Sequence, residues 1–249
     1  MRRVVRGQGI TRQQENGETT MAVYLQNLSA RAPQMQDLEA VTQLVNVSDI
    51  AEYGMSDCTK EDILAIWHKP GFQLKTDAWV IVTKKEQLVG YAVVWHDQYA
   101  YIYMKLVVHP DYRRRGIGTF LLRLAEQRAR SLALQAKPGM RVTLGCTVSQ
   151  INETARQLLE REGYVQTRHY WRIVIEVDDE SLHASGQIGA SGKLKVALDI
   201  DSQRLTGAKQ LYERDGVYII RQYAVFEKLL RDGEEQCSAE EISDQLILV

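Results

Sequence analysis

The chain has 249 residues, of which 45% are hydrophobic and 25% are charged, as in an ordinary globular protein. A formal net charge of -1 gives no excess of positive charge, which argues against a nucleic-acid partner. Every apolar run is shorter than the roughly 18 residues that a membrane-spanning helix needs, so no membrane partner is expected. The cysteines Cys58, Cys146 and Cys237 are far apart and lack Cys-x-x-Cys spacing. They predict a cytoplasmic protein without a disulfide framework or a metal site.

The N-terminal part predicts a polar tail, a strand and two helices. Residues 1–21 hold four arginines and no apolar stretch, so they are predicted to be a disordered tail. Residues 22–30 alternate as a short strand does, and residues 34–47 carry apolar side chains at helical spacing. A second helix is predicted over residues 60–68, where Pro70-Gly71 ends it.

Three β-rich stretches follow, at residues 79–83, 87–95 and 99–108. Residues 84–86, Lys-Lys-Glu, predict a hairpin turn between the first two stretches. The third ends at Pro110, which lacks the backbone donor that a sheet requires. Three consecutive strands with short connections predict an antiparallel meander.

The next elements alternate between helix and strand. After Gly116 the apolar residues fall on one face of an amphipathic helix. Residues 141–148 then predict a strand, residues 153–162 a helix closed by Gly163, and residues 164–177 a long strand. The order of elements to this point is βαα βββα βαβ.

The C-terminal part contains an internal repeat. Residues 179–192 hold serines and glycines without periodicity and predict a linker. Beyond it, residues 208–216 resemble residues 155–163 almost residue for residue, within a strand, helix and strand that span residues 193–232. This segment is predicted to be a partial, degenerate second copy without the meander. Residues 233–249 are predicted to be a flexible tail.

The segment with the clearest chemistry is the arginine loop, residues 113–119, with the sequence Arg-Arg-Arg-Gly-Ile-Gly-Thr. The first amides of a helix have no acceptor within it, and the helix dipole places positive potential there, so such a site attracts phosphate. The arginines add charge, the threonine adds a hydroxyl, and the glycines lack the Cβ that would block close approach. The spacing differs from that of nucleotide-hydrolase and dinucleotide loops, so another phosphate ligand is predicted.

The stretch from Leu106 to Leu122 resembles the acyl-CoA-binding motif of the GNAT N-acetyltransferase superfamily, Arg/Gln-x-x-Gly-x-Gly/Ala between a strand and a helix. The motif positions are occupied by Arg113, Gly116 and Gly118. The resemblance extends over residues 22–178, since Asn152, Ala155 and Gly163-Tyr164 match the family's Asn-x-x-Ala... Gly-Phe/Tyr segment. It implies an α/β (α+β) fold, a mixed and mostly antiparallel sheet flanked by helices, with residues 193–232 as a GNAT-like appendage.

The resemblance also implies the reaction, in which an acetyl group passes from acetyl-CoA to a primary amine of a small molecule or peptide by direct attack on the thioester. The backbone of Leu106, Val107 and Val108 would pair with the pantetheine arm where two strands splay apart. The Val108 amide would stabilise the oxyanion, and Asn152 would contact the cofactor near the thioester. The residues implied to bind the cofactor at the loop are Arg113, Arg114, Arg115, Gly116, Ile117, Gly118 and Thr119.

Two catalytic groups of the family are missing from their usual places. Members that protonate the leaving thiolate with a tyrosine commonly have it at the position of Leu159. The residues between Tyr99 and Pro110 include no Asp or Glu, so the strand glutamate that often serves as base is also absent. The alternative function is therefore a non-catalytic acyl-CoA-binding or assembly module.

Further catalytic candidates lie in the meander. His96 and Asp97 could form a proton relay, and Tyr99, Tyr101 and Tyr103 could line an acceptor pocket by alternating on one face. The alternative is a strand end at the surface with one packed aromatic face.

Three further predictions concern packing. Asn152 could be only the N-cap of the helix that follows it, although the two roles can coexist. Cys146 lies in an apolar strand and is predicted to be buried. The C-terminal segment offers a sheet edge, which packing on the first domain or a homodimer would cover.

Overall fold

The computed structural model describes residues 11–15, 18–22, 27–56, 58–177, 194–201 and 217–234. Contacts divide the chain into two compact units, the first made of Met1–Cys146 and Lys228–Val249 and the second of Thr147–Glu227. The two units divide after Cys146 and before Lys228, which does not test the domain boundaries predicted near residues 22, 178 and 193. Those boundaries stay predictions.

The N-terminal segment contains a two-stranded hairpin, in which β1 (Thr11–Glu15) pairs antiparallel with β2 (Glu18–Ala22). The sequence between the strands is Asn-Gly, the pair that two-residue hairpin turns favour. At residues 11–15 and 18–21 the structure therefore differs from the disordered tail predicted over residues 1–21, and the rest of that range lies outside the described residues. Of the strand predicted over residues 22–30, β3 (Leu28–Arg31) confirms the last part, and residues 23–26 lie outside the described residues.

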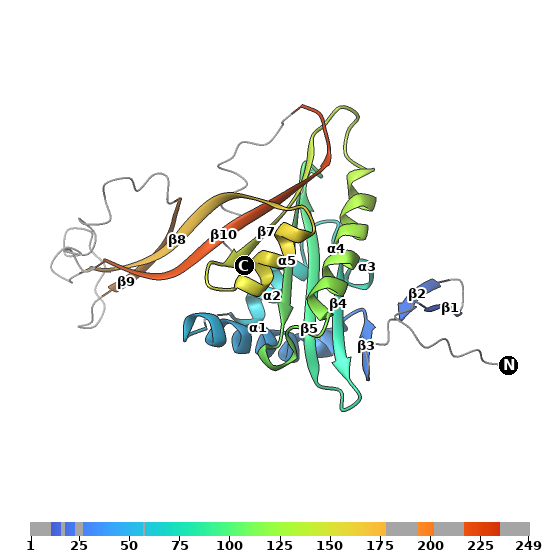
Figure 1. Ribbon diagram of the computed structural model, residues 1–249, viewed down its shortest axis with the longest axis horizontal. Helices are drawn as coiled ribbons and strands as arrows, with labels where there is room; N and C mark the ends of the chain where they lie inside the picture. Colours follow the sequence, from blue (N-terminus) through green and yellow to red (C-terminus); the bar gives the residue numbers. More distant parts are fainter. Residues whose placement is uncertain are drawn as a thin grey trace. The chain divides into compact units, whose positions relative to one another are not determined.

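The first unit is built on a five-stranded arrangement in the order β3-β4-β5-β6-β7. β3, β4, β5 and β6 pair antiparallel with their neighbours, and β7 runs parallel to β6, so the predicted meander is confirmed. The strands not yet given are β4 (Ala78–Thr83), β5 (Leu88–Asp97), β6 (Tyr101–Val108) and β7 (Val142–Ser149). Figure 1 shows β4 and β5 side by side in this unit.

The helices of the first unit are the short η1 (Met35–Asp37), α1 (Leu38–Tyr53), α2 (Lys60–Trp67), α3 (Leu74–Asp77) and α4 (Ile117–Ala133). Among them, α2 matches the predicted range and α4 begins where it is predicted, whereas α1 extends past the predicted end at residue 47 and α3 is not predicted. Gly54 ends α1 in a left-handed conformation. Thr59 starts α2 with a capping box, since its hydroxyl accepts from the Asp62 amide while the Asp62 carboxylate accepts from the Thr59 amide.

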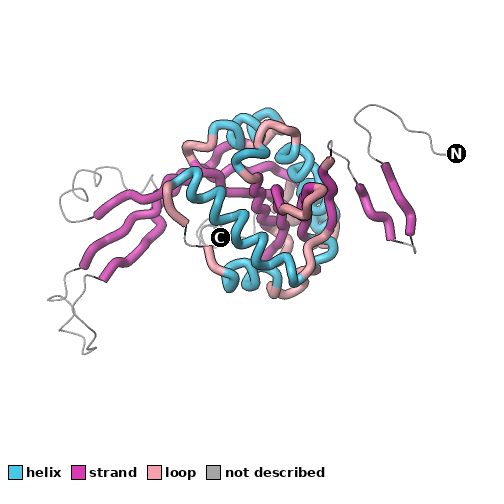
Figure 2. Tube along the Cα trace, turned by 90° about the horizontal axis from the view of Figure 1, so that it is seen from below, coloured by secondary structure: helices cyan, strands magenta, loops and turns pink. Residues whose placement is uncertain are grey.

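Helices cover both faces of these strands. On one face, Ile117 and Leu121 of α4 form a buried cluster with Ala92 of β5. Successive residues of a strand point to opposite faces, so Tyr91 lies on the other face, where Trp67 of α2 donates Nε1–H to its hydroxyl at 2.9 Å. Burial raises the pKa of Tyr91 above its usual range, so the phenol stays neutral. Figure 2 shows helices on both sides of the central strands.

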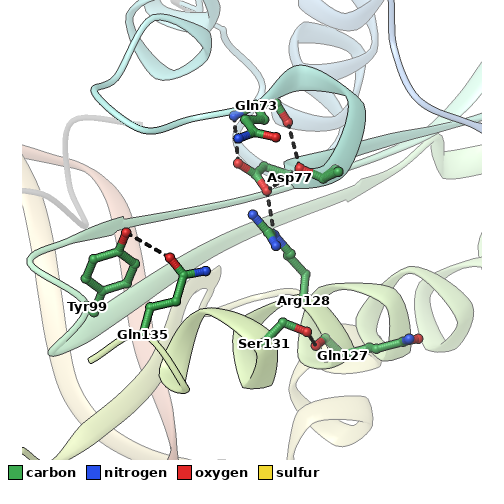
Figure 3. Close-up of polar contacts among 8 residues, drawn as sticks. Gln73, Asp77, Tyr99, Gln127, Arg128, Ser131 and Gln135 are labelled. Carbon is green, nitrogen blue, oxygen red and sulfur yellow. Dashed lines mark hydrogen bonds and ion pairs between the residues drawn. The ribbon is translucent and has the colours of Figure 1, made fainter. Parts of the chain in front are cut away.

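A buried ion pair joins the start of β4 to α4. Asp77, whose side chain is 5% exposed, accepts from Nε of Arg128 at 2.6 Å. The same carboxylate accepts from the backbone amide of Gln73 at 2.7 Å (Figure 3). These contacts fix the position of α4 along its own axis relative to α3. They therefore help to fix where the N-terminus of α4 lies.

The second unit contains α5 (Glu153–Arg161), β8 (Val165–Val177), β9 (Leu194–Asp201) and most of β10 (Val217–Arg231). β8 pairs antiparallel with β9 on one side and β10 on the other, and Figure 1 shows the three strands running together. The strands predicted in the C-terminal segment are thus confirmed. The helix predicted over residues 208–216 and the linker predicted over residues 179–192 lie outside the described residues, and a second copy of the fold is not shown.

The end of β10 and the residues after it belong to the first unit. Arg231 donates to four backbone carbonyls at the C-terminal end of α4, those of Ala133, Ala136, Lys137 and Met140, at 2.6–3.4 Å. Glu234 exchanges backbone hydrogen bonds with Gly139 and Arg141 at 2.8 and 2.9 Å. The flexible tail predicted from residue 233 therefore differs from the structure at its first two residues, which are anchored to the turn after α4.

Gly145 of β7 is required by a close approach. A methyl group at this position would overlap the Tyr101 phenol ring, with Cε1 only 2.8 Å away. We expect Gly145→Ala to lower the free energy of unfolding by about 1–3 kcal/mol, the usual cost of overpacking. Urea unfolding should measure the loss, and in a Tyr101→Leu background the same substitution should cost little. An equal loss in both backgrounds would contradict the contact.

Candidate functional site

The arginine loop connects β6 to α4 through a short helical turn, η2 (Pro110–Tyr112). His109 caps this turn, since its Nδ1 accepts from the Asp111 amide at 3.3 Å and its carbonyl accepts from the Tyr112 amide at 2.9 Å. The sequence folds in this way because proline suits the first position of a helical turn, where no backbone donor is needed. His109 is thus a capping residue of the loop.

The loop presents backbone amides in an unusual conformation. Arg114 has φ 61° and Gly116 has φ 82°, so both lie in the left-handed region. The first amide of α4 to bond back is that of Phe120, to Gly116 O at 3.0 Å. The amides of the preceding residues of α4 have no acceptor within the helix. Left-handed residues and helix N-termini gather amides around a common point, which makes a site for an anion.

The three arginine side chains of the loop have different surroundings. Arg113 is paired with Glu52 of α1 at 2.7 Å. Arg115 lies over the Tyr112 ring, 4.7 Å from its centroid, and donates to Asp111 O at 2.8 Å. Arg114 is exposed. The positive charge that faces solvent at the loop therefore comes from Arg114 and Arg115, whereas the charge of Arg113 is balanced by the protein.

One edge of β6 is available for pairing. Alternate residues of an antiparallel pair direct their backbone groups across it. The backbone N–H of His109 donates to Val89 O at 3.0 Å. The odd-numbered residues at this end of β6 therefore direct their N–H and C=O groups toward β5. The even-numbered residues point to the other side, and accordingly Thr143 of β7 donates to Ala100 O at 3.1 Å. Pairing with β7 covers only residues 101–103, so within the described part of the first unit the later even-numbered residues face no strand.

This geometry separates the three backbone contacts that the sequence predicts. Leu106 and Val108 direct their N–H groups to the open edge, where a ligand could pair with them. Val107 is the register partner of Tyr91, and its backbone groups point to β5. Because β6 pairs with β7 over only a few residues, the two strands separate beyond that point, as the prediction requires. The geometry favours Leu106 and Val108 over Val107 as backbone contacts.

The catalytic candidates of the meander lie far from Val108. His96 is the register partner of Ile102, which precedes Val108 by about 20 Å at 3.3 Å per residue, and its ring stacks on Tyr99 at 3.8 Å. Tyr103 precedes Val108 by about 17 Å on the same basis. Asp97 is the last residue of β5, farther still along the hairpin. The structure does not bring these residues together with the Val108 amide.

The tyrosines of this region do not line a common pocket. Tyr101 and Tyr103 are buried, with ring centroids 4.7 Å apart, and Tyr103 also stacks on Trp95 at 5.5 Å. Tyr99 lies in the turn before β6, where its hydroxyl donates to Gln135 Oε1 at 3.2 Å (Figure 3). The observed arrangement is the packed aromatic face of the alternative prediction, and Tyr99 does not share that face because its positive φ of 64° belongs to the turn.

Asn152 directly precedes α5 of the second unit, and Leu159 lies within this helix. Asn152 caps this helix, since its Oδ1 accepts from the Ala155 amide at 3.1 Å, so the predicted capping role is confirmed. A contact between Asn152 and a cofactor stays a prediction. Leu159 is 2% exposed and so is a buried apolar residue, where the family resemblance expects a tyrosine.

Two further findings concern metal binding and membranes. Among the described residues, no three His, Cys, Asp or Glu side chains gather as a metal site requires. Cys146 is 3% exposed and so is buried as predicted, while Cys237 lies outside the described residues. No helix in the described segments has the length and apolar character needed to cross a membrane.

Sequence reasoning did not identify Ser48 and Glu52 of α1, which both contact Arg113. The two residues are four positions apart and so lie on one helix face. This spacing marks a polar patch on α1, but it does not indicate which distant cation the patch binds.

Comparisons with known proteins find a matching family model and similar folds. Residues 75–166 match the family model described as an acetyltransferase (GNAT) domain. A GCN5-related N-acetyltransferase from Sphaerobacter thermophilus has a similar fold, with a TM-score of 0.68 and 19% identity over 85% of this chain and 98% of that chain. A proposed acetyltransferase from Salmonella typhimurium, solved with its cofactor acetyl-CoA, has a TM-score of 0.50 and 15% identity over 86% and 99% of the two chains. A search of curated proteins finds no match.

Proposed function

Because residues 75–166 match the family model of a GNAT acetyltransferase domain, we propose that the protein is an N-acetyltransferase that moves an acetyl group from acetyl-CoA to a primary amine. The observation that carries this proposal is the open edge of β6, which leads directly into the amides of the arginine loop. A long, thin ligand with an amide-containing arm and a terminal pyrophosphate fits that combination of an unpaired strand edge and an anion site.

The residues of this chain would bind the parts of acetyl-CoA in order along β6 and α4. The amides of residues 114–119, with the exposed charge of Arg114, would hold the pyrophosphate at the positive end of the α4 dipole. The backbone of Leu106 would pair with the pantetheine amides as a neighbouring strand does. Acetyl-CoA supplies the thioester carbonyl that the amine attacks, with the CoA thiol as leaving group.

The Val108 amide is the group of this chain that is proposed to contact the reacting atoms. Its N–H points to the open edge and would donate to the thioester oxygen as negative charge develops there, a contribution of about 3–4 kcal/mol for an oxyanion donor of this kind. The proton that the amine loses would pass through water, because the part of β6 near Val108 carries no carboxylate. The acceptor is proposed to be a small molecule or a peptide with a neutral primary amine.

Thiol release tests the proposal. Incubation with acetyl-CoA and a panel of primary amines should release CoA thiol at a rate that depends on the amine, and mass spectrometry should find the acetylated product. Acetyl-CoA at 100 times its dissociation constant should also stabilise the fold by about 2.7 kcal/mol. If neither CoA nor acetyl-CoA raises the melting temperature, the acyl-CoA site is wrong.

A second function, a non-catalytic acyl-CoA-binding module, is favoured by Leu159, an apolar core residue where the family often places its acid. This function predicts thermal stabilisation by acetyl-CoA without thiol release above the rate of uncatalysed hydrolysis for any amine in the panel. Turnover with even one amine would exclude it.

A further inference from the structure

We propose that Ser48 and Glu52 of α1 are positioning residues for acyl-CoA binding, because they hold Arg113 at the end of the open edge of β6. The inference rests on the proposed function, since it concerns how the protein shapes the site for acetyl-CoA.

Arg113 joins three parts of the first unit through its hydrogen bonds. Its Nη2 donates to Glu52 Oε1 at 2.7 Å and to Ser48 Oγ at 2.9 Å, both in α1. Its Nε donates to Val108 O at 3.3 Å, at the end of β6. Its backbone amide donates to Pro110 O at 3.3 Å, within the loop. One side chain thus connects α1, the last peptide of β6 and the start of the arginine loop.

Burial makes this set of contacts more than a surface ion pair. The side chains of Glu52 and Arg113 are 12% and 26% exposed, and Ser48 is 7% exposed. A carboxylate with so little access to water needs a cation beside it, because removal of one partner leaves an uncompensated buried charge. Glu52 therefore keeps Arg113 directed toward α1 and away from solvent, whereas Arg114 stays exposed.

The consequence for the site lies at Val108. Its N–H and C=O both point to the open edge of β6, because the backbone groups of one strand residue share a side. The Arg113 guanidinium donates to the Val108 carbonyl and leaves the Val108 N–H for the ligand. The unpaired edge of β6 therefore ends at this guanidinium. Without Glu52, the Arg113 side chain keeps Ser48 and the Val108 carbonyl as acceptors but loses its charged partner, so the Val108 peptide and the loop amides are held less firmly.

The substitution Glu52→Gln gives opposite results for the two roles that Arg113 could have. If Glu52 positions the site, the dissociation constant for CoA should rise at least about tenfold, as expected when the carboxylate acceptor of a charge-assisted hydrogen bond becomes a neutral amide. The KM for the amine should change by less than about twofold, because the acceptor does not contact Arg113 in this scheme. If Arg113 instead binds phosphate directly, Glu52→Gln frees the cation and should tighten CoA binding.

A double variant gives a second and independent readout. Glu52→Gln with Arg113→Gln removes both charges and leaves two amides that can bond to each other. Positioning predicts that the double variant recovers CoA affinity to within about threefold of wild type, because contacting residues couple strongly. Direct phosphate binding predicts that it stays as weak as Arg113→Gln alone. Isothermal titration with CoA measures all four proteins.

A matched control is Glu39→Gln, which removes an acid from α1 that pairs with Lys60 at the surface. It should leave CoA affinity unchanged. If Glu52→Gln does not fold, Ser48→Ala decides the matter, with an expected loss of about fivefold for one hydrogen bond, and unchanged affinity overturns the inference. Wild-type protein that binds no CoA would overturn the proposed function, whereas wild-type binding with equal or tighter binding by Glu52→Gln overturns this inference alone.

Discussion

Gly118→Glu is expected to weaken acetyl-CoA binding at least 100-fold while leaving the unliganded fold as stable as wild type or slightly more stable. Gly118 is the second residue of α4, so a carboxylate there would face the proposed pyrophosphate. Two like charges about 4 Å apart repel by about 4 kcal/mol at the effective dielectric of a protein surface. Replacing glycine in a helix favours helix formation by about 0.5–1 kcal/mol, and an acid in the first turn suits the dipole.

The expected changes in acetyl-CoA affinity and in the stability of the unliganded fold have opposite signs, which makes this variant informative. Isothermal titration should show the loss of acetyl-CoA binding, and the melting temperature without ligand should not fall. Gln127→Glu is the matched control, because it adds the same charge to an exposed position of α4, about 14 Å farther along the helix. Gly118→Ala adds bulk without charge and should give an intermediate loss. If Gly118→Glu binds acetyl-CoA at micromolar or lower concentration with the wild-type affinity, the phosphate is bound elsewhere.

Most of the fold between residues 34 and 177 could be predicted because its elements have strong periodic patterns. The amphipathic spacing of α4 and the β-rich strands of the meander are local signals, and the structure confirms them within a few residues. The sequence does not predict the hairpin β1–β2, although Asn-Gly is a hairpin signal, because its polar residues are typical of a tail. Its strands have no apolar alternation that would have indicated a sheet.

The candidate site divides in the same way into local and non-local parts. The amides of the arginine loop follow from local sequence, because a strand, two glycines and a helix start determine them. The partner of Arg113 does not, since Glu52 lies 61 positions earlier in the chain and many anions could have served. The separation of Leu106 and Val108 from Val107 also required the register with β5, which a one-residue slip would have reversed.

Removing residues 228–249 is expected to lower the melting temperature by about 8–16 °C, although most of β10 and all of α4 remain. The truncation removes the Arg231 guanidinium, which donates to four carbonyls after α4, and the Lys228 pair with Glu126 at 2.7 Å. It also removes the Glu234 backbone bonds to Gly139 and Arg141. Charge-assisted bonds contribute about 1.5–3 kcal/mol each, so a total loss of about 4 kcal/mol is a conservative expectation. For a chain of this size, each kcal/mol corresponds to about 2–4 °C.

The matched control is a truncation after Glu234, which keeps every one of these contacts and should melt closer to wild type than the longer truncation does. Arg231→Ala isolates the largest single contribution, about 1.5–3 kcal/mol. Because the C-terminal end of α4 is fixed by these contacts and its N-terminus carries the arginine loop, the longer truncation should also weaken acetyl-CoA binding. Two truncations with equal melting temperatures and equal affinities would show that α4 is held in place without the end of β10.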